Sequence, residues 1–234
     1  MASIKLLGAG AAQAVIGEVA ASCGGLGWTI DAEYGGVHAM AARVASGEAA
    51  DVIVLTRDLV DDLAAAGALR AESRSDVGCV GTGLAVRAGS PAPDVETPEA
   101  LRRALLAATL VIHPDAAVAT AGRSLRAALE VLGIEAEVAP RLVACANGAA
   151  AAQRLAAGQG GEVGVMQVTE IVAHRGLTFA GPFPGALRRD TVYCAAVSTG
   201  SRKADIASAF IRRLVAARTL LRSAGFSSPS PAGR

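Results

Sequence analysis

Apolar and polar positions in the first third of the chain follow two different periods. Ile4, Leu6 and Leu7 form a short apolar run, and an alanine-rich pattern with helical spacing begins just after Gly8-Ala9-Gly10. Apolar residues at every second position of 28–34 indicate a strand. Residues 51–55, which are all apolar after Asp51, are typical of a strand covered by helices on both faces. The predicted order is strand 4–7, helix 12–23, strand 28–34, helix 37–46, strand 51–55 and helix 58–66. This alternation favours a mostly parallel sheet.

A second series of elements begins after the polar residues 70–76, which predict a surface loop. Residues 77–87 are apolar and punctuated by glycines. Thr97-Pro98-Glu99 is typical of a helix start, because it supplies a capping hydroxyl, a proline in the first turn and an acid near the positive end of the helix dipole. Further strands are expected at 110–113, 137–143, 162–168, 177–180 and 191–197, helices at 121–132, 148–157 and 202–221, and a frayed tail at 226–231.

The two series predict an α/β protein with two lobes joined by two crossover segments. The first crossing is placed near residue 80, and the strand 191–197 returns the chain to the first lobe. The first lobe is therefore expected to hold residues 1–80 and 195–234, and the second lobe residues 81–194. Each lobe is predicted to be Rossmann-like, with a mixed, mostly parallel sheet. A ligand cleft is expected between the lobes, since strand C-termini and domain interfaces are the usual ligand sites of such folds.

Four strand-to-helix turns of small residues predict an anion site. The first N–H groups of a helix have no acceptor within it and the helix dipole is positive there, so a turn without bulky side chains lets an anion approach them. The candidate main-chain donors are Gly10, Ala11, Ala12, Gly36, Val37, Thr120, Ala121, Gly122, Asn147 and Gly148. The alternative for each of these positions is an ordinary tight turn.

Five side chains near these turns are candidates for ligand contacts. Arg123 is suited to a planar, two-point contact with a carboxylate, and Arg57 follows the strand 51–55 at the end where such sheets hold ligands. Thr56 offers a hydroxyl group, and Gln13 and Gln167 offer amides. The alternatives are surface arginines paired with carboxylates, and glutamines that pack locally or face solvent.

Composition and charge argue against nucleic acid and a lipid bilayer as binding partners. The 234 residues carry a net charge of +1 and 3% aromatic residues, so no basic stripe with interleaved aromatic residues indicates nucleic acid. No apolar run approaches the roughly 20 residues that a membrane span needs. The sequence as written begins without a signal peptide, which predicts a cytoplasmic protein, or a periplasmic one if a leader was removed. The widely spaced cysteines Cys23, Cys79, Cys145 and Cys194 are expected to be small buried thiols, and neither a metal nor a cofactor is implied.

Five segments carry a family resemblance. They are the opening strand with GAGAAQAV, YGGVHAMAARVASGEAADVIVLT at 34–56, HPDAAVATAGRSLRAALEVLG at 113–133, GEVGVMQVTEI at 161–171 and LRSAGF at 221–226. In this order they resemble the type II periplasmic-binding-protein superfamily, and within it the molybdate-binding-protein-like branch, which implies that family's two-lobed fold. Molybdate binders resemble one another in placing serines where this chain has Gly10 and Gly36-Val37-His38, and a tyrosine where it has Gln167. These departures weaken the case for molybdate.

The segment GVMQVTEI resembles a divergent subgroup of that branch, which includes aconitate isomerase, and this implies a carboxylate ligand. One expectation is a binding protein that closes on a small anionic molecule, a di- or tricarboxylate, and that works with an ABC transporter only if it is exported. The alternative is a cytoplasmic isomerase that moves a proton along an unsaturated carboxylate, with His38 or His113 as the base. Both histidines have structural or surface positions as alternatives, and Glu170 is expected to cap or pair locally. Molybdate or tungstate binding is the third possibility.

Overall fold

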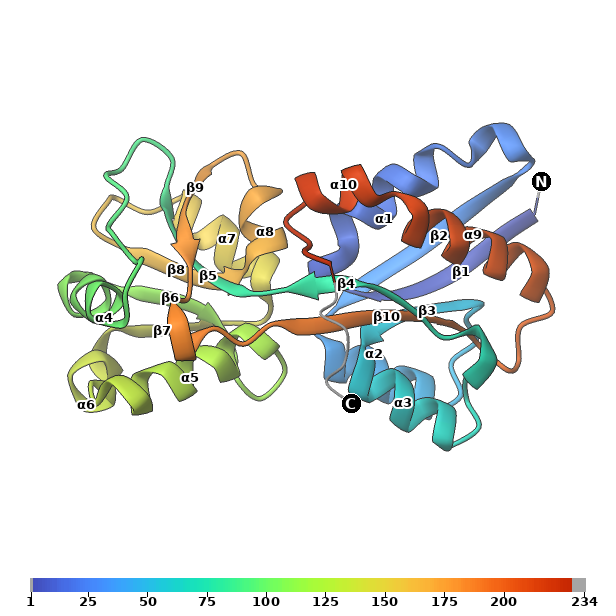
Figure 1. Ribbon diagram of the computed structural model, residues 1–234, viewed down its shortest axis with the longest axis horizontal. Helices are drawn as coiled ribbons and strands as arrows, with labels where there is room; N and C mark the ends of the chain where they lie inside the picture. The colour runs from blue at the N-terminus through green and yellow to red at the C-terminus, as the bar shows by residue number, and fades with distance from the viewer. Residues whose placement is uncertain (1, 229–234) are drawn as a thin grey trace. The chain divides into compact units, whose positions relative to one another are not determined.

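The computed structural model describes residues 2–228, and the chain divides into two compact units. The first unit comprises Met1–Cys79 and Thr191–Arg234, and the second comprises Val80–Asp190. From the sequence, these two borders are expected after residues 80 and 194. Each unit holds one five-stranded mixed sheet with helices on both faces (Figure 1), so the predicted α/β fold class is confirmed.

The sheet of the first unit has the order β2-β1-β3-β10-β4. Its strands are β1 (Ala2–Ala9), β2 (Trp28–Gly35), β3 (Val52–Thr56), β4 (Ser75–Val80) and β10 (Thr191–Val197). Strand β1 lies between β2 and β3 and pairs in parallel with both, whereas β10 runs antiparallel to the central strand β3. The helices are α1 (Gln13–Ala21), α2 (Val37–Ala45), α3 (Arg57–Ala65), α9 (Ala204–Ala216) and α10 (Arg218–Ser223). In Figure 1, α2 and α3 cover one face of this sheet, and α1 and α9 cover the other.

The sheet of the second unit has the order β7-β6-β8-β5-β9. Its strands are β5 (Thr82–Arg87), β6 (Val111–Pro114), β7 (Leu142–Cys145), β8 (Val163–Gln167) and β9 (Leu177–Pro182). The strand β6 pairs in parallel with β7 and β8, and β5 runs antiparallel to both β8 and β9. The helices are α4 (Pro98–Ala107), α5 (Thr120–Leu132), α6 (Glu135–Val138), α7 (Gly148–Ala156) and α8 (Val168–Val172).

Interior strands are covered on both faces, as their unbroken apolar sequences predict. All five residues of β3 are buried, and so are all five of β8. Along β8, Val165 packs into the cluster that contains Leu125 of α5, whereas Met166 packs into the cluster that contains Leu155 of α7. Successive side chains of a strand point to opposite faces of a sheet, so one apolar strand supplies both core layers.

Helix ends follow the predicted chemistry at both termini. The Thr97 hydroxyl accepts a hydrogen bond from the N–H of Ala100 at 3.1 Å, which caps α4 in front of Pro98. Gly133 ends α5 with a φ of 64°, a left-handed conformation that glycine adopts without steric cost.

The predicted strand 137–143 is wrong in its first half. Residues Glu135–Val138 form α6, and β7 begins only at Leu142. Ile134 and Val138 are both fully buried, and residues four apart share one face of a helix, not of a strand. The apolar spacing there was therefore helical.

Three other predictions need correction. The surface loop 70–76 includes the start of β4 at Ser75, and the apolar stretch 77–87 is two strands that break at Gly81. The helix 202–221 breaks at Ala217 into α9 and α10. The tail does not fray at Phe226, which is 4% exposed and packs edge-on against Tyr193, whereas residues 229–231 of the predicted tail lie outside the described part.

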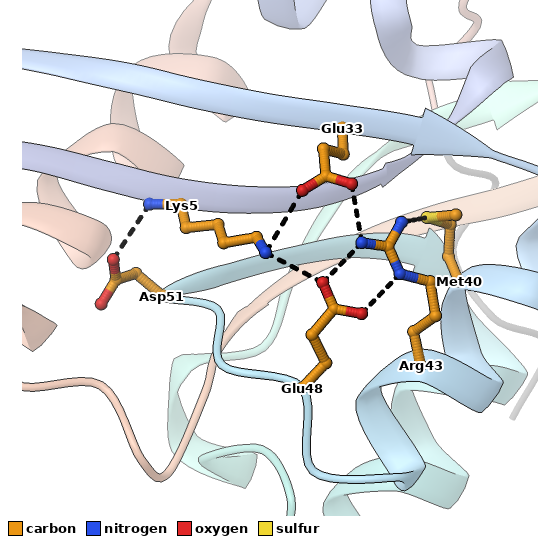
Figure 2. A network of polar contacts seen from close by, with 6 residues as sticks. All are labelled: Lys5, Glu33, Met40, Arg43, Glu48 and Asp51. Atoms are coloured by element: carbon orange, nitrogen blue, oxygen red, sulfur yellow. Dashed lines mark hydrogen bonds and ion pairs between the residues drawn. The ribbon is translucent and has the colours of Figure 1, made fainter.

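Four charged side chains form a network beside α2 in the first unit (Figure 2). Lys5 Nζ of β1 lies 3.2 Å from Glu33 Oε1 of β2 and 2.9 Å from Glu48 Oε1 in the loop after α2. Arg43 of α2 donates to the same two carboxylates, to Glu33 Oε2 at 2.7 Å and to Glu48 Oε2 at 2.6 Å. Hydrogen bonds from Arg43 and then Lys5 lower the pKa of Glu48 to about 2. The network therefore links both strands to the helix through charge.

Replacing Glu48 with glutamine removes the carboxylate shared by Lys5 and Arg43. A carboxyl group whose pKa is lowered on folding stabilises the protein above its unfolded pKa, and this contribution is lost as the pH falls toward the folded pKa of about 2. We expect Glu48→Gln to melt below wild type at pH 7 in low salt, with a difference that shrinks in 0.5 M salt and below about pH 3. Glu72→Gln, at an exposed position, is the control. A difference independent of salt and pH would mean that packing, not charge, matters at Glu48.

Candidate functional site

In the first unit, three parallel strands end at one edge of the sheet, and a helix follows each of them. The register places Gly8 of β1 directly opposite Tyr34 of β2 and Val54 of β3. Each of the three strands therefore ends within two residues of this level, at Ala9, Gly35 and Thr56. The candidate residues that follow share this edge: Gly10, Ala11, Ala12, Gln13, Gly36, Val37, His38, Thr56 and Arg57.

Main-chain N–H groups dominate this edge of the first unit. Gly10–Ala12 form a 3-10 turn that leads into α1, Gly36 is the N-terminal cap of α2, and Thr56 is the cap of α3. No side chain caps any of these helix starts through a hydrogen bond. Because the first N–H groups of a helix also have no acceptor within it, they are the hydrogen-bond donors that this edge offers.

The candidate side chains of the first unit differ in how they are held. Gln13 and His38 are exposed, and Thr56 is 7% exposed. Arg57, which begins α3, makes a two-point ion pair with Asp76 of β4 through its Nε and Nη2, with Nε 3.1 Å from Oδ1. This pairing raises the pKa of Arg57. It also occupies the N–H edge of the guanidinium to which the carboxylate of a ligand would bind.

The second unit repeats the arrangement at the ends of β6, β7 and β8. Pro114 of β6 lies opposite Cys145 of β7, and Ile112 lies opposite Gly164 of β8. The candidate residues of this unit lie in the last residues of these strands or after them, at one edge of the sheet: His113, Thr120, Ala121, Gly122, Arg123, Asn147, Gly148 and Gln167. The structure thus gathers the candidate residues into two groups, one in each unit. That both groups serve one ligand stays a prediction.

At the start of α5 the chain is packed tightly against the end of β6. A Cβ on Gly122 would overlap the carbonyl oxygen of Pro114, so glycine is required by this close approach. His113 is 9% exposed, and its Nδ1 donates to the same carbonyl oxygen at 2.9 Å, which leaves Nε2 as the acceptor of a neutral ring. Arg123 is exposed and donates to the Thr120 hydroxyl at 3.3 Å.

Side chains cap the starts of α7 and α8. The Asn147 Oδ1 accepts from the N–H of Ala150 at 2.9 Å. Gln167 and Glu170 form a capping box at α8, in which Glu170 Oε2 accepts from the N–H of Gln167 at 3.2 Å. The expected local capping role of Glu170 is therefore present. Gln167 is 4% exposed, so its amide is held at the strand end by the helix that follows.

Three polar side chains at this edge of the second unit were missed as candidates for function. Burial raises the pKa of Glu170 to about 7, against the opposing effect of the Gln167 N–H. The hydroxyls of Thr82 and Thr169 are buried without a hydrogen-bond partner among the described residues. Thr82 lies opposite Gln167 in the β5–β8 ladder. In the sequence, the feature that could have indicated Thr82 is its position after Gly81, as the first residue of an apolar strand.

A hollow of about 610 Å³ lies elsewhere, where β3 begins and β10 ends. None of the candidate residues lines this hollow. The charged and hydroxyl-bearing residues that line it include Lys5, Glu48, Asp51, Ser198, Thr199 and Lys203. These polar groups are largely engaged with one another or with the main chain, as for Lys5 in Figure 2. The hollow is therefore separate from the candidate helix starts.

Residues 2–228 contain neither a candidate metal-binding cluster nor a candidate membrane-spanning helix. Within this range, no group of three or more His, Cys, Asp and Glu residues is placed to hold a metal ion, and no helix has the length and hydrophobicity to cross a bilayer. Cys23, Cys79 and Cys194 are buried thiols as predicted, whereas Cys145 is only partly buried.

The sequence profile of bacterial extracellular solute-binding proteins matches residues 4–227. The chain belongs to this family. The structure of this family member is similar to that of the periplasmic molybdate-binding protein of Azotobacter vinelandii, with a TM-score of 0.79 at 18% identity over 97% of this chain and 100% of that one. The sulfate-binding protein SubI of Mycobacterium tuberculosis H37Rv gives a TM-score of 0.75 at 19% identity over 99% and 88%. At such identities the similarity concerns the fold, and it confirms the predicted resemblance.

An aconitate isomerase from Pseudomonas sp. is a relative by sequence. It is 28% identical to this family member over 178 residues, which are 76% of this chain. The match spans 66% of the relative, slightly less than two thirds of its length.

The raised pKa of Glu170 predicts an unusual pH dependence of stability. A carboxyl group whose pKa rises on folding, here from 4.5 to about 7, makes the folded state progressively less stable as the pH increases through that interval. We expect Glu170→Gln, which keeps the shape and the hydrogen-bonding ability of the capping residue, to be more stable than wild type at pH 8 by on the order of 2–3 kcal/mol. The difference vanishes near pH 4.5. Urea unfolding at several pH values measures it.

Glu162→Gln is a control for this measurement with the opposite sign. The Glu162 carboxylate accepts from the N–H groups of Gln159 at 2.9 Å and Gly160 at 2.7 Å, and these bonds lower its pKa. This variant is expected to be less stable than wild type at pH 8. A Glu170→Gln variant that is less stable than wild type at pH 8 would show that the Glu170 carboxyl is ionised without penalty in the folded protein.

Proposed function

We propose that this solute-binding-family chain binds a small organic anion, a di- or tricarboxylate, through the main-chain N–H groups at its helix starts. The observation that carries the proposal is the uncapped starts of α1, α2 and α3 at one edge of the first sheet. Main-chain N–H groups at the positive end of helix dipoles favour negatively charged ligands. The second unit adds the start of α5, which also has no side-chain cap.

The side chains near these helix starts favour a carboxylate over a compact metal oxyanion. Arg123 has a guanidinium with donors that match the two oxygens of a carboxylate, and Gln167 offers an amide. In the first unit, Gly10 and Gly36 bring main-chain donors but no hydroxyl groups. A tetrahedral oxyanion surrounded by few hydroxyl donors would leave several of its oxygens poorly bonded, whereas a flat carboxylate needs fewer donors at each point.

An isomerase of unsaturated carboxylates is the second candidate function, supported by the similarity to an aconitate isomerase. Such an enzyme needs a base that removes a proton from the carbon next to a double bond and returns it at the other end of the allylic system. His113 fits this role better than His38, because the bond from its Nδ1 to Pro114 fixes the tautomer in which Nε2 accepts a proton. His38 lies exposed in the first turn of α2.

Thermal shift measurements with a panel of anions test the proposed function. A ligand that binds only the folded state raises the melting temperature. We expect a rise with citrate, cis-aconitate or trans-aconitate, and none with sulfate, molybdate or tungstate at equal concentration. Proton NMR of each bound carboxylate then detects conversion, which would select the isomerase. A rise with molybdate alone would contradict the choice of a carboxylate.

Arg123→Ala, compared with Arg126→Ala, tests the side-chain contact. Both arginines are exposed on α5, but only Arg123 lies in its first turn. Loss of a charged hydrogen bond to a carboxylate is expected to weaken binding by about 10–100-fold in Arg123→Ala. The control variant should bind as wild type does in isothermal titration calorimetry. Equal affinities of both variants and wild type would remove Arg123 from the site.

A further inference from the structure

A half-buried carboxyl group lies against the first residue of α7. Gly148 begins this helix, and a Cβ at this position would overlap both oxygens of the Glu170 carboxyl group. The carboxyl of α8 can therefore occupy this place only because residue 148 is a glycine. The carboxyl accepts a hydrogen bond from the N–H of Gln167 at 3.2 Å. A carboxyl group and the start of a neighbouring helix are thus in direct contact within the second unit.

The same helix start has donors that suit an anion. The Asn147 side chain bonds the N–H of Ala150, whereas the N–H groups of Gly148 and Ala149 have no acceptor within the helix. An ionised Glu170 would compete with a ligand carboxylate for the positive end of α7. Two like charges so close to each other, in a place shielded from water, raise each other's pKa.

The elements packed against α8 supply little charge to offset a second anion. These elements are α7, β5, β8 and β9. Their charged residues are Arg154, near the end of α7, and Arg87, the last residue of β5, while His174 follows α8. Burial raises the pKa of Glu170, the N–H of Gln167 opposes the shift, and none of these three side chains is among its causes.

Two buried hydroxyl groups close to the end of β8 have no hydrogen-bond partner among the described residues. Thr82 is 2% exposed and Thr169 is 3% exposed, and neither Oγ1 has a partner among residues 2–228. A buried polar group without a partner costs free energy that a polar ligand can recover. Thr169 lies next to Glu170 in the first turn of α8, and Thr82 lies across the ladder from Gln167.

We propose that Glu170 couples anion binding in the second unit to the uptake of a proton, so that a ligand carboxylate binds at the start of α7 only while the Glu170 carboxyl is neutral. The proposal rests on the proposed function, and it makes Glu170 a residue that tunes affinity without being a donor to the anion. Binding moves one proton from solvent to a Glu170 oxygen when the carboxyl is ionised beforehand. Above neutral pH, the ligand therefore binds less tightly.

Isothermal titration calorimetry of the full chain tests this coupling. The probe is trans-aconitate or citrate, whichever binds wild type more tightly, at pH 7.5 in Tris and in HEPES, whose different ionisation enthalpies reveal the protons exchanged. With a free-state pKa of about 7, wild type should take up about 0.8 proton per ligand more than Glu170→Gln does. Between pH 6 and 8.5 the wild-type affinity should fall about 30-fold relative to that of the variant. Glu130→Gln, an exposed carboxylate on α5, should behave as wild type.

The possible failures are distinguishable. Binding with equal proton uptake in wild type and Glu170→Gln would overturn the coupling and leave the proposed function intact. The absence of binding by either tricarboxylate at every pH would overturn the proposed function and the coupling together. A Glu170→Gln variant that no longer binds at pH 6 would also contradict the proposal, because the neutral side chain is the state that permits binding.

Discussion

The main-chain N–H groups at the starts of helices determine how this protein can meet a ligand. Parallel strands oblige the chain to return through a helix, and each helix begins at the same edge of its sheet. In the first unit, the ends of β1, β2 and β3 lie level in the sheet, and no side chain caps the helix starts that follow them. Such donors are satisfied by water or by an anion.

The two units meet this constraint differently. The first unit leaves the starts of α1, α2 and α3 uncapped, and its ion pairs include the network beside α2 (Figure 2) and the pair of Arg57 with Asp76. The second unit uses Asn147 at α7 and the box of Gln167 and Glu170 at α8 as caps. A capped helix start is more stable but less open to an external anion, so the second unit combines binding with a side chain that can itself carry charge.

Strong periodic signals allowed most of the fold to be predicted from sequence. The apolar run of β3 and the Thr97-Pro98-Glu99 start of α4 each had a local physical cause, and both appear in the structure as expected. The errors arose where long-range packing decided the outcome. Phe226 follows a helix in a polar tail, yet it is held against Tyr193 of β10 and fills the space left by Gly78.

The candidate site was predictable only in its main-chain part. Turns of small residues identified the helix starts, because their chemistry does not depend on distant partners. Side-chain roles depend on contacts between remote segments, and the sequence did not reveal these. The ion pair of Arg57 with Asp76 joins residues that are 19 positions apart. The Glu170 carboxyl group contacts Gly148, which is 22 positions away in the sequence. The contact of this carboxyl group with the start of α7 is consequently visible only in the folded protein.

The most direct test of the account is a map of amide ¹H–¹⁵N shifts on addition of trans-aconitate. If main-chain groups at helix starts hold the anion, the largest changes fall on Gly10, Ala11, Ala12, Gly36, Val37, Thr120, Ala121, Gly122 and Gly148. Changes confined to the lining of the hollow at Lys5, Glu48 and Lys203, or spread without preference over the surface, would contradict it.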